Sequence, residues 1–312
     1  MTNGYDVIGD VHGSATKLEA LLHQLGYTHD GSSWRHPERT AVFVGDLIDR
    51  GDRQLDVVDI ARRMVDHGHA HVMMGNHEFN AIAWATEHPD RPGAYLRQRT
   101  DKNRSQHAEF LKQVEEPPGK HRELIDWFRT LPMWLDLDGL RVVHACWHEP
   151  SQQDVGQRLD EGNTVLVAAS ERGTAEHRAI EWLLKGPEIP LPEGFAYLDK
   201  GGHLRRHARF RWWDPTATTL RRGALIPPGT SGDDGKPLAE LPDEPHGHDH
   251  LPTYTDTVPL VVGHYWETGT PTPLARHVAC VDYSAVKGGP LVAYRWTRGE
   301  TEIHAANFVA AN

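Results

Sequence analysis

Cysteine, long apolar runs and an excess of positive charge are all scarce in this sequence. Only two of the 312 residues are cysteine, too few for a disulfide framework, so we expect a protein of a reducing compartment. Cys146 and Cys280 each lie in an apolar run, which favours buried and unreactive thiols. No apolar run reaches membrane-spanning length and no charged leader precedes one, so we expect a cytoplasmic protein.

The charge balance is negative and limits the classes of partner. The chain has 33 Lys and Arg against 44 Asp and Glu, a formal net charge of −11. Nucleic acids and anionic lipid surfaces would repel such a chain, so we expect no membrane association and no general nucleic-acid binding. Bound divalent cations could still make one pocket positive. The aromatic residues, which include ten Trp, are enough for a sizeable core.

Three short apolar segments are each followed by a polar loop that contains glycine. YDVI precedes GDVHGS, TAVFV precedes GDLIDRG, and HVMM precedes GNHE. After the first loop, Leu18, Leu21, Leu22 and Leu25 recur at helical spacing, and a similar pattern follows the second loop up to Val65. The alternation of strand, loop and helix predicts an α/β protein whose functional loops lie at the carboxyl ends of the strands.

The rest of the chain adds further strands and two insertions. MWLDLDGLRVVHAC predicts a hairpin around Asp138-Gly139 that ends at His144. TVPLVVGH, HVACVDYS, PLVAYRW and TEIHAA are short β-type segments, which we expect to complete a second sheet. We expect a single domain, 1–312, with insertions at about 84–130 and 145–256. The first insertion contains a helical segment, HRELIDWFRTL, and could shape the substrate site or be a surface excursion.

Polar residues that suit metal binding and acid–base chemistry gather at the predicted strand ends. A lone member of this group has a simpler explanation, because a strand-end Asp often caps a helix and a loop His often hydrogen-bonds at the surface. Their joint occurrence instead suggests a centre of two metals roughly 3.5–4 Å apart, with Asp46 as the bridging carboxylate. The set comprises Asp10, His12, Asp46, Asp49, Arg50, Asn76, His77, His144 and His264.

The motifs GDVHG, GDLIDRG, GNHE, VVHA and VVGH, in this order, resemble those of calcineurin-like metallophosphoesterases of the phosphoprotein-phosphatase type. They extend from residue 9 to residue 264. The resemblance implies a four-layer αββα sandwich, in which two mixed β-sheets pack face to face between helices. GHYW has Trp266 where many calcineurin-like hydrolases have a second His, which agrees with the phosphoprotein-phosphatase type. The loops are most similar to bacterial members, including serine/threonine phosphatases and diadenosine-tetraphosphatase-like enzymes.

The resemblance also implies a role for each motif residue. Two divalent ions are implied as cofactors, with Mn²⁺ as the first choice and Fe, Zn, Ni, Co or Mg as alternatives. Asp49, Arg50 and His77 are implied as catalytic residues: His77 protonates the leaving oxygen, Asp49 orients the His77 ring, and Arg50 grips phosphate. Asp49 and Arg50 could also form a local ion pair. The implied metal ligands are Asp10, His12 and Asp46 for the first ion, and Asp46, Asn76, His144 and His264 for the second.

The implied reaction is phosphomonoester hydrolysis by direct attack of a hydroxide that bridges the two metals. The substrate would be a phosphoprotein or a small molecule. A second hypothesis is hydrolysis of dinucleoside polyphosphates such as diadenosine tetraphosphate. A third is a metal-binding scaffold without turnover, which we disfavour because every expected motif position is filled.

Overall fold

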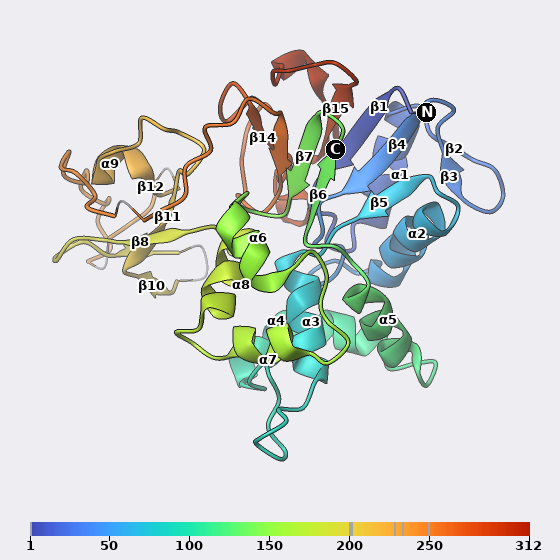
Figure 1. The fold of residues 1–312 in the computed structure, drawn as a ribbon, viewed down its shortest axis with the longest axis horizontal. Coiled ribbons are helices and arrows are strands. Elements are labelled where there is room, and N and C mark those ends of the chain that lie inside the picture. The colour runs from blue at the N-terminus through green and yellow to red at the C-terminus, as the bar shows by residue number, and fades with distance from the viewer. Residues whose placement is uncertain (1, 200–201, 228, 233, 249) are drawn as a thin grey trace. The chain divides into compact units, whose positions relative to one another are not determined.

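The computed structural model describes residues 2–199, 202–227, 229–232, 234–248 and 250–312 (Figure 1). The chain forms two compact units, one made of Met1–Lys185 with Thr257–Asn312 and the other of Gly186–Asp256. The second unit falls within the expected insertion at 145–256, whereas every predicted site residue falls in the first. Within the described part of the chain, no helix is both long and apolar enough to cross a membrane.

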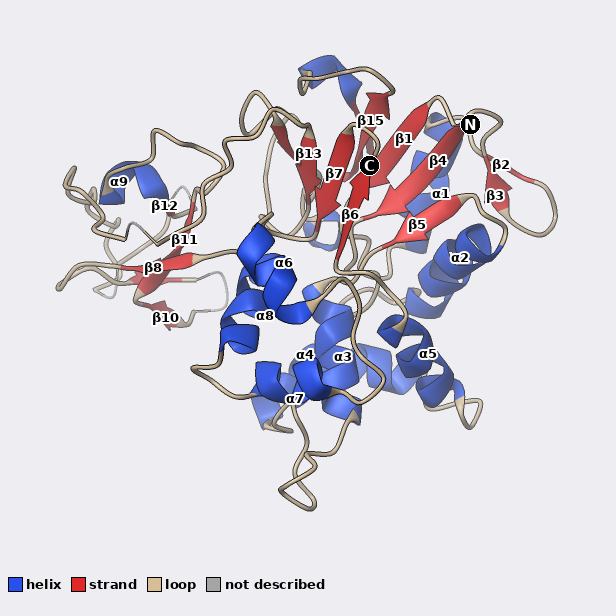
Figure 2. Cartoon of the chain, viewed as in Figure 1, coloured by secondary structure: helices blue, strands red, loops and turns tan. Residues whose placement is uncertain are grey.

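The larger sheet of the first unit combines three predicted N-terminal strands with two strands from the C-terminal part of the chain (Figure 2). In sheet order these are β16 (Phe308–Ala311), β15 (Leu291–Thr297), β1 (Gly4–Ile8), β4 (Arg39–Phe43) and β5 (Ala70–Val72). Strands β1, β4 and β5 run parallel, while β15 pairs antiparallel with both β1 and β16. The carboxyl ends of the three parallel strands therefore meet at one edge, as the loops predict.

The smaller sheet contains the predicted hairpin and two later strands. In sheet order its members are β14 (Val278–Cys280), β13 (Leu260–Val262), β7 (Leu140–Val143) and β6 (Trp134–Leu137). Leu137 pairs with Leu140, and Gly139 between them has a φ of 92°, so the tight turn at Asp138-Gly139 is confirmed. Strand β13 runs parallel to both β7 and β14.

The expectation that all four C-terminal segments complete this second sheet is only half right. TVPLVVGH and HVACVDYS supply β13 and β14, but PLVAYRW forms β15 of the larger sheet. Five of the seven residues of β15 are buried, which suits a strand that lies between two others and has both faces covered. TEIHAA forms no strand; it runs into a 3₁₀ turn, η2 (Ala305–Asn307), that precedes β16.

The two sheets pack face to face, and helices cover the other face of the larger sheet. Val7 and Val42 of the larger sheet share a core cluster with Val142 and Val261 of the smaller one. Their neighbours along the strands, among them Phe43, point the opposite way into a second cluster with the helices. The predicted α/β class with two packed mixed sheets is confirmed.

The helices of the first unit include those predicted from apolar spacing. HRELIDWFRTL corresponds to α5, and both α4 and α5 fall in the expected insertion at 84–130. The helices are α1 (Ala15–Gln24), α2 (Gln54–Asp66), α3 (Asn76–Ala85), α4 (Asp101–Gln113), α5 (Lys120–Arg129), α6 (Glu149–Val155), α7 (Thr164–Ser170) and α8 (Ala175–Lys185). A short hairpin, β2 (Thr28–His29) with β3 (Trp34–Arg35), and a 3₁₀ turn, η1 (Ala285–Lys287), complete this unit's elements.

The second unit has its own small sheets and aromatic core. Trp212 and Trp213 are buried in it, and their rings meet edge to face. Its elements are β8 (Glu188–Pro190), β9 (Tyr197–Leu198), β10 (Leu204–Arg205), β11 (His207–Phe210), α9 (Leu220–Gly223) and β12 (Ala224–Leu225). Beyond β12, the described residues up to Asp256 form turns and isolated bridges, in keeping with their Pro- and Gly-rich composition.

A buried carboxylate ties together the three central strands of the larger sheet. Asp6 of β1 is fully buried, and its Oδ1 accepts hydrogen bonds from Arg39 Nε of β4 at 3.0 Å and from Arg295 Nε of β15 at 2.9 Å. One acidic charge therefore pairs with two cations on the neighbouring strands. Removing the carboxylate would leave both guanidinium groups without their shared partner.

We predict that Asp6→Ala lowers the free energy of unfolding by about 3 kcal/mol or more, because it breaks a buried ion pair. Urea unfolding followed by far-UV circular dichroism measures the loss. Asp138→Ala is the matched control, since its ion pair with Arg298 is exposed and its removal should change stability little. Equal losses in the two variants would contradict a structural role for the Asp6 cluster.

Candidate metal centre

The predicted site residues lie in five segments, each of which follows the carboxyl end of a strand. Three segments belong to the larger sheet and two to the smaller one, so both sheets contribute to one site. All of these residues are buried except Arg50 and His77. Asp10 and His12 follow β1; Asp46, Asp49 and Arg50 follow β4; Asn76 and His77 begin α3 after β5; His144 follows β7; and His264 follows β13.

Backbone strain is concentrated in these loops. Among the described residues, eight that are not glycine have a positive φ, and five of the eight belong to the predicted site. Such conformations are costly for L residues and persist only where the surrounding structure holds them, as it commonly does at functional sites. The five are His12, Asp46, Asp49, Arg50 and His264, with φ values from 45° to 73°.

Two motif glycines leave room for carboxylates. A Cβ atom on Gly75 would lie 2.2 Å from Asp46 Oδ1, and one on Gly263 would lie 2.2 Å from Asp10 Oδ1. Any larger residue at either position would displace the carboxylate beside it. Glycine is thus required at these positions of GNHE and VVGH, because the backbone there lies very close to the acidic side chains.

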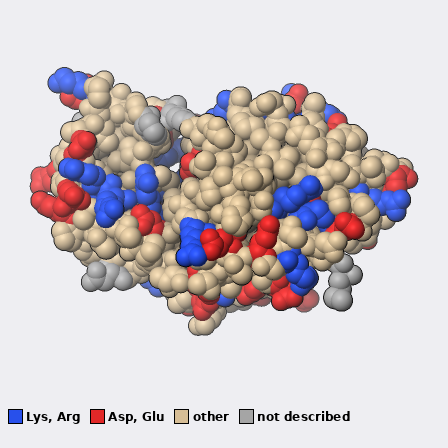
Figure 3. Space-filling model, turned by 90° about the horizontal axis from the view of Figure 1, so that it is seen from above, with Lys and Arg blue, Asp and Glu red and all other residues tan. Residues whose placement is uncertain are grey.

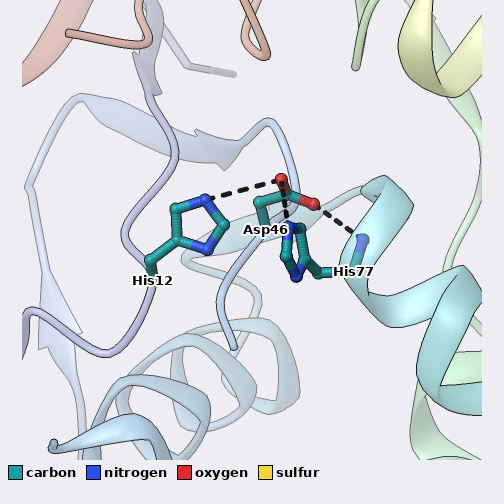
Figure 4. A group of neighbouring side chains, drawn as sticks. All are labelled: His12, Asp46 and His77. Carbon is teal, nitrogen blue, oxygen red and sulfur yellow. Dashed lines mark hydrogen bonds and ion pairs between the residues drawn. The ribbon is translucent and has the colours of Figure 1, made fainter. Parts of the chain in front are cut away.

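Asp46 lies at the centre of the site (Figure 4). Its Oδ2 is 3.6 Å from His12 Nε2, 3.8 Å from His77 Nε2 and 3.5 Å from His144 Nε2. Its Oδ1 accepts a hydrogen bond of 3.0 Å from the backbone N–H of His77. Two groups of side chains with metal-ligand spacing share this carboxylate: His12, Asp46 and His77, and Asp46, His144 and His264.

Backbone carbonyl groups aim the histidine rings. His12 Nδ1 donates to the Ile48 carbonyl and His144 Nδ1 to the Val44 carbonyl, each at 2.8 Å, which leaves both Nε2 atoms turned toward Asp46. His12 Nε2 is buried and has no hydrogen-bond partner among the described residues. A buried ring nitrogen with an open lone pair, beside a carboxylate, fits a divalent cation.

The electrostatics of the centre also fit a cation. Burial, followed by the charge of His77, lowers the pKa of His12 to about 3, so this ring is neutral and able to coordinate. Burial lowers the pKa of His144 as well, but Asp46 outweighs burial and raises it to about 10. Burial opposes ionisation of Asp46, yet His144 and His77 hold its pKa well below the usual range. The negative charge of Asp46, which keeps a proton on His144, would equally attract a metal ion.

Two expected ligands occupy different positions in the centre. Asn76 Oδ1 lies 3.2 Å from His144 Nε2, next to the second group. Asp10 falls outside both groups; its carboxylate oxygens accept from the backbone N–H of His264 at 3.2 and 3.3 Å. Burial, and then the nearby charge of Asp282, raise the pKa of Asp10 well above its usual value.

His77 and Asp49 form the pair implied by the motifs. His77 Nδ1 donates to Asp49 Oδ2 at 2.5 Å, and Arg50 Nη2 lies 3.4 Å from His77 Nε2. Burial opposes ionisation of Asp49, but hydrogen bonds from His107 and His77 outweigh it and lower the pKa of Asp49 below its usual range. His77 Nε2 therefore faces the centre beside an exposed guanidinium.

Three further residues of the site were not predicted. Glu78 lies within the GNHE motif, yet no role follows from its type alone. Asp282 follows β14 and carries the same strand-end signal as Asp10; its carboxylate accepts from the backbone N–H groups of Trp266 and Ser284. His107 of α4 reaches Asp49 from a segment without any readable motif, so no sequence signal marked it.

A cationic cluster borders the centre at Trp266. The Arg50 guanidinium carbon lies 5.5 Å from the centroid of the Trp266 ring, and Lys287 Nζ lies 4.4 Å from the same centroid. Both cations are exposed. They place positive charge beside an otherwise acidic and histidine-rich site.

The two cysteines are free and buried, as predicted. Burial raises the pKa of both thiols well above the usual value, so neither is a ready nucleophile.

Residues 5–185 match the family model of the calcineurin-like phosphoesterases. Two bacterial relatives, both named asymmetrical bis(5'-nucleosyl)-tetraphosphatase PrpE, match parts of the chain. The protein from Oceanobacillus iheyensis is 30% identical over 141 residues, which are 45% of this chain and 54% of the relative. That from Halalkalibacterium halodurans is 43% identical over 74 residues, 23% of this chain and 30% of the relative. The chain thus spans about a third to a half of the length of these curated relatives.

A solved structure shares the fold. It is a protein serine/threonine phosphatase from Saccharomyces cerevisiae with similarity to human phosphatase PP5, which aligns with a TM-score of 0.52 and 14% identity over 98% of this chain and 78% of that chain.

We predict that Asp46→Asn lowers metal stoichiometry from two divalent ions per chain, because it removes the charge that both ligand groups share. Elemental analysis after equilibration with Mn²⁺ and gel filtration gives the stoichiometry. Asp59→Asn, an exposed residue paired with Arg63 on α2, is the control and should retain both ions. Full occupancy in Asp46→Asn would refute the bridging assignment.

Proposed function

The chain belongs to the calcineurin-like phosphoesterase family, and on that basis we propose that it is a metal-dependent phosphoesterase that hydrolyses phosphomonoesters. One observation carries the proposal: two ligand groups share Asp46, His77 belongs to one of them, and Asp49 and Arg50 lie directly beside His77. The substrate is a phosphoprotein or a small phosphorylated molecule. The free thiols suit the reducing cytoplasm, where we propose that the protein acts.

The donor set fits two divalent ions. Histidine nitrogens with carboxylate and amide oxygens suit Mn²⁺ first, with Fe, Zn, Ni, Co or Mg as alternatives. His12, Asp46 and Asp10 would hold one ion, and Asp46, Asn76, His144 and His264 the other. When bound, such ions lower the pKa of water and withdraw charge from phosphate oxygens.

The side chains of the protein would then orient the ester and move one proton. Arg50 presents its planar donors to the non-bridging phosphate oxygens, where charge develops in the transition state. Asp49 accepts from His77 Nδ1 and so directs His77 Nε2 toward the site, where the protonated ring gives its proton to the leaving oxygen. Because Arg50 lies next to His77 Nε2, the phosphate and its leaving group are held together.

The nucleophile is water rather than a side chain. Two thiols lie near the site: Cys146 is two residues beyond His144, and Cys280 Sγ is 3.5 Å from the carbonyl oxygen of Gly263, next to His264. Both are fully buried and burial raises the pKa of each. We therefore propose a direct displacement at phosphorus without a phosphoenzyme.

Hydrolysis of a dinucleoside polyphosphate is the second candidate. The two relatives above are named as tetraphosphatases. Lys287 and Arg50, both against Trp266, offer a second cation to a substrate that carries several phosphates. On the face drawn in Figure 3, Lys and Arg stand in small groups among Asp and Glu, which suits a compact phosphate ligand better than a long polyanion. A scaffold without turnover is the least favoured candidate, since the catalytic positions are filled.

We predict that His77→Ala slows alkyl phosphate hydrolysis by about 10²–10⁴-fold and slows aryl phosphates far less, because an aryl oxide leaves with little need for a proton. Steady-state kinetics with both esters gives the two ratios, and elemental analysis shows whether two ions remain. Equal losses on both esters, or loss of an ion, would make His77 a structural residue or a ligand.

We predict that a single turnover in ¹⁸O-labelled water, with enzyme in excess, places one labelled oxygen in the released phosphate. Mass spectrometry of the product measures it. The control Cys146→Ser should retain most activity. Unlabelled phosphate would mean that water attacks carbon and that the C–O bond breaks. A phosphoenzyme hydrolysed by water would give labelled phosphate as well, so the outcome that would demand a covalent intermediate is loss of turnover in Cys146→Ser while both ions stay bound. The same experiment with a dinucleoside tetraphosphate separates the two candidate substrates, since its products identify which anhydride bond is cut.

A further inference from the structure

A buried histidine outside every motif contacts the catalytic pair. His107 lies on α4, its side chain is fully buried, and its Nδ1 is 2.8 Å from Asp49 Oδ1. The other oxygen of that carboxylate, Oδ2, accepts from His77 Nδ1 at 2.5 Å. Asp49 thus bridges two imidazole rings, one on α3 and one on α4.

The proton positions follow from the chemistry of the carboxylate. An ionised carboxylate only accepts hydrogen bonds, so both histidines must donate from Nδ1. His107 Nε2 has no hydrogen-bond partner among the described residues, and the ring packs against Phe110 and Trp84 with centroids 4.9 and 5.8 Å away. In the described part of the chain, the one hydrogen bond of the His107 ring is therefore the bond to Asp49.

We propose that His107 is a positioning residue for the acid His77, acting through Asp49. By occupying Oδ1, His107 prevents the carboxylate from rotating, so that Oδ2 stays aligned with His77 Nδ1 and Nε2 stays aimed at the leaving oxygen. The backbone of Asp49 is held separately, because its N–H donates to Gln54 Oε1 at 2.8 Å. His107 supplies the missing restraint on the side chain.

This inference gives the segment at 84–130 a part in catalysis. Helix α4 carries His107 on its buried face together with Phe110, while most of its other residues are polar and at least partly exposed. The helix therefore supports the acid His77 indirectly, through Asp49. The inference rests on the phosphoesterase function proposed above.

The test compares two substitutions of His107. His107→Phe keeps the ring and removes the donor. His107→Asn keeps a donor, because its amide nitrogen stands as many bonds from Cβ as imidazole Nδ1 does. On an alkyl phosphate we expect His107→Phe to lower kcat by about 10-fold or more with little change in KM, and His107→Asn to restore most of the loss. Aryl phosphate turnover should change far less.

A double-mutant cycle shows whether the effect passes through the acid. In the His77→Ala background, His107→Phe should cause no further loss on the alkyl ester, because the group that it positions is gone. His121→Phe is the matched control: His121 contacts the same Phe110 from α5 but does not touch Asp49, and its variant should keep the wild-type ratio of the two esters. Elemental analysis should find two ions in every variant.

A readout that needs no turnover separates this inference from the proposed function. In the ¹H NMR spectrum, imidazole N–H protons bonded to a carboxylate resonate far downfield, so the wild type should show one from His77 and one from His107. His107→Phe should remove the His107 resonance and shift the His77 resonance. If the Phe variant does not fold, His107→Leu is used in its place. An unshifted His77 signal, additive losses in the cycle, or equal losses on both esters would overturn the positioning role. Failure of the wild type to cleave either ester would refute the proposed function and leave the spectral test decisive.

Discussion

The carboxylate of Glu78 is the constraint on which the rest of the site depends. It is fully buried and accepts hydrogen bonds from the backbone N–H groups of Asp46, Leu47 and Gly75 at 2.8, 2.9 and 3.0 Å. One side chain thus joins the loop after β4 to the start of α3. Asp46 is held at a φ of 52° by this clamp, and the distances from Asp46 to three histidines follow from it.

Several acidic side chains lie close together around Glu78, and histidine side chains offset their negative charge. Burial, followed by the charge of Asp46, raises the pKa of Glu78 to about 7, and burial also raises the pKa of Asp282. Carboxylates packed this closely repel one another unless protons or cations lie between them. Cation binding and folding of the site are therefore linked, because the same ligands are far apart in the unfolded chain.

The sequence predicted the parts of this site that are encoded locally. A glycine-flanked loop after an apolar strand is a contiguous pattern, so Asp46 and His77 could be placed at the edge of a sheet before the structure was known. His107 could not, because its contact with Asp49 depends on how α4 docks, and the helix carries no motif. The apolar pattern of PLVAYRW also could not show which sheet the segment joins, because a strand buried on both faces has no polar face to indicate its neighbouring strands. The compact unit at 186–256 has only short strands and two adjacent tryptophans as signals.

Strand β1 lies between β4 and β15, and this arrangement has a consequence for biosynthesis. Ile8 pairs with Phe43 on one side and with Ala293 on the other, and the N–H of Gly9, next to Asp10, donates to the Val292 carbonyl. A ribosome makes the first of these partners within seconds of β1 and the second only after about 250 further residues, at roughly 5–20 residues per second. A nascent chain can therefore carry all the motif residues while the strand that leads to Asp10 still has one open side. Such an edge can pair wrongly, so the site is exposed to misfolding until β15 has been made.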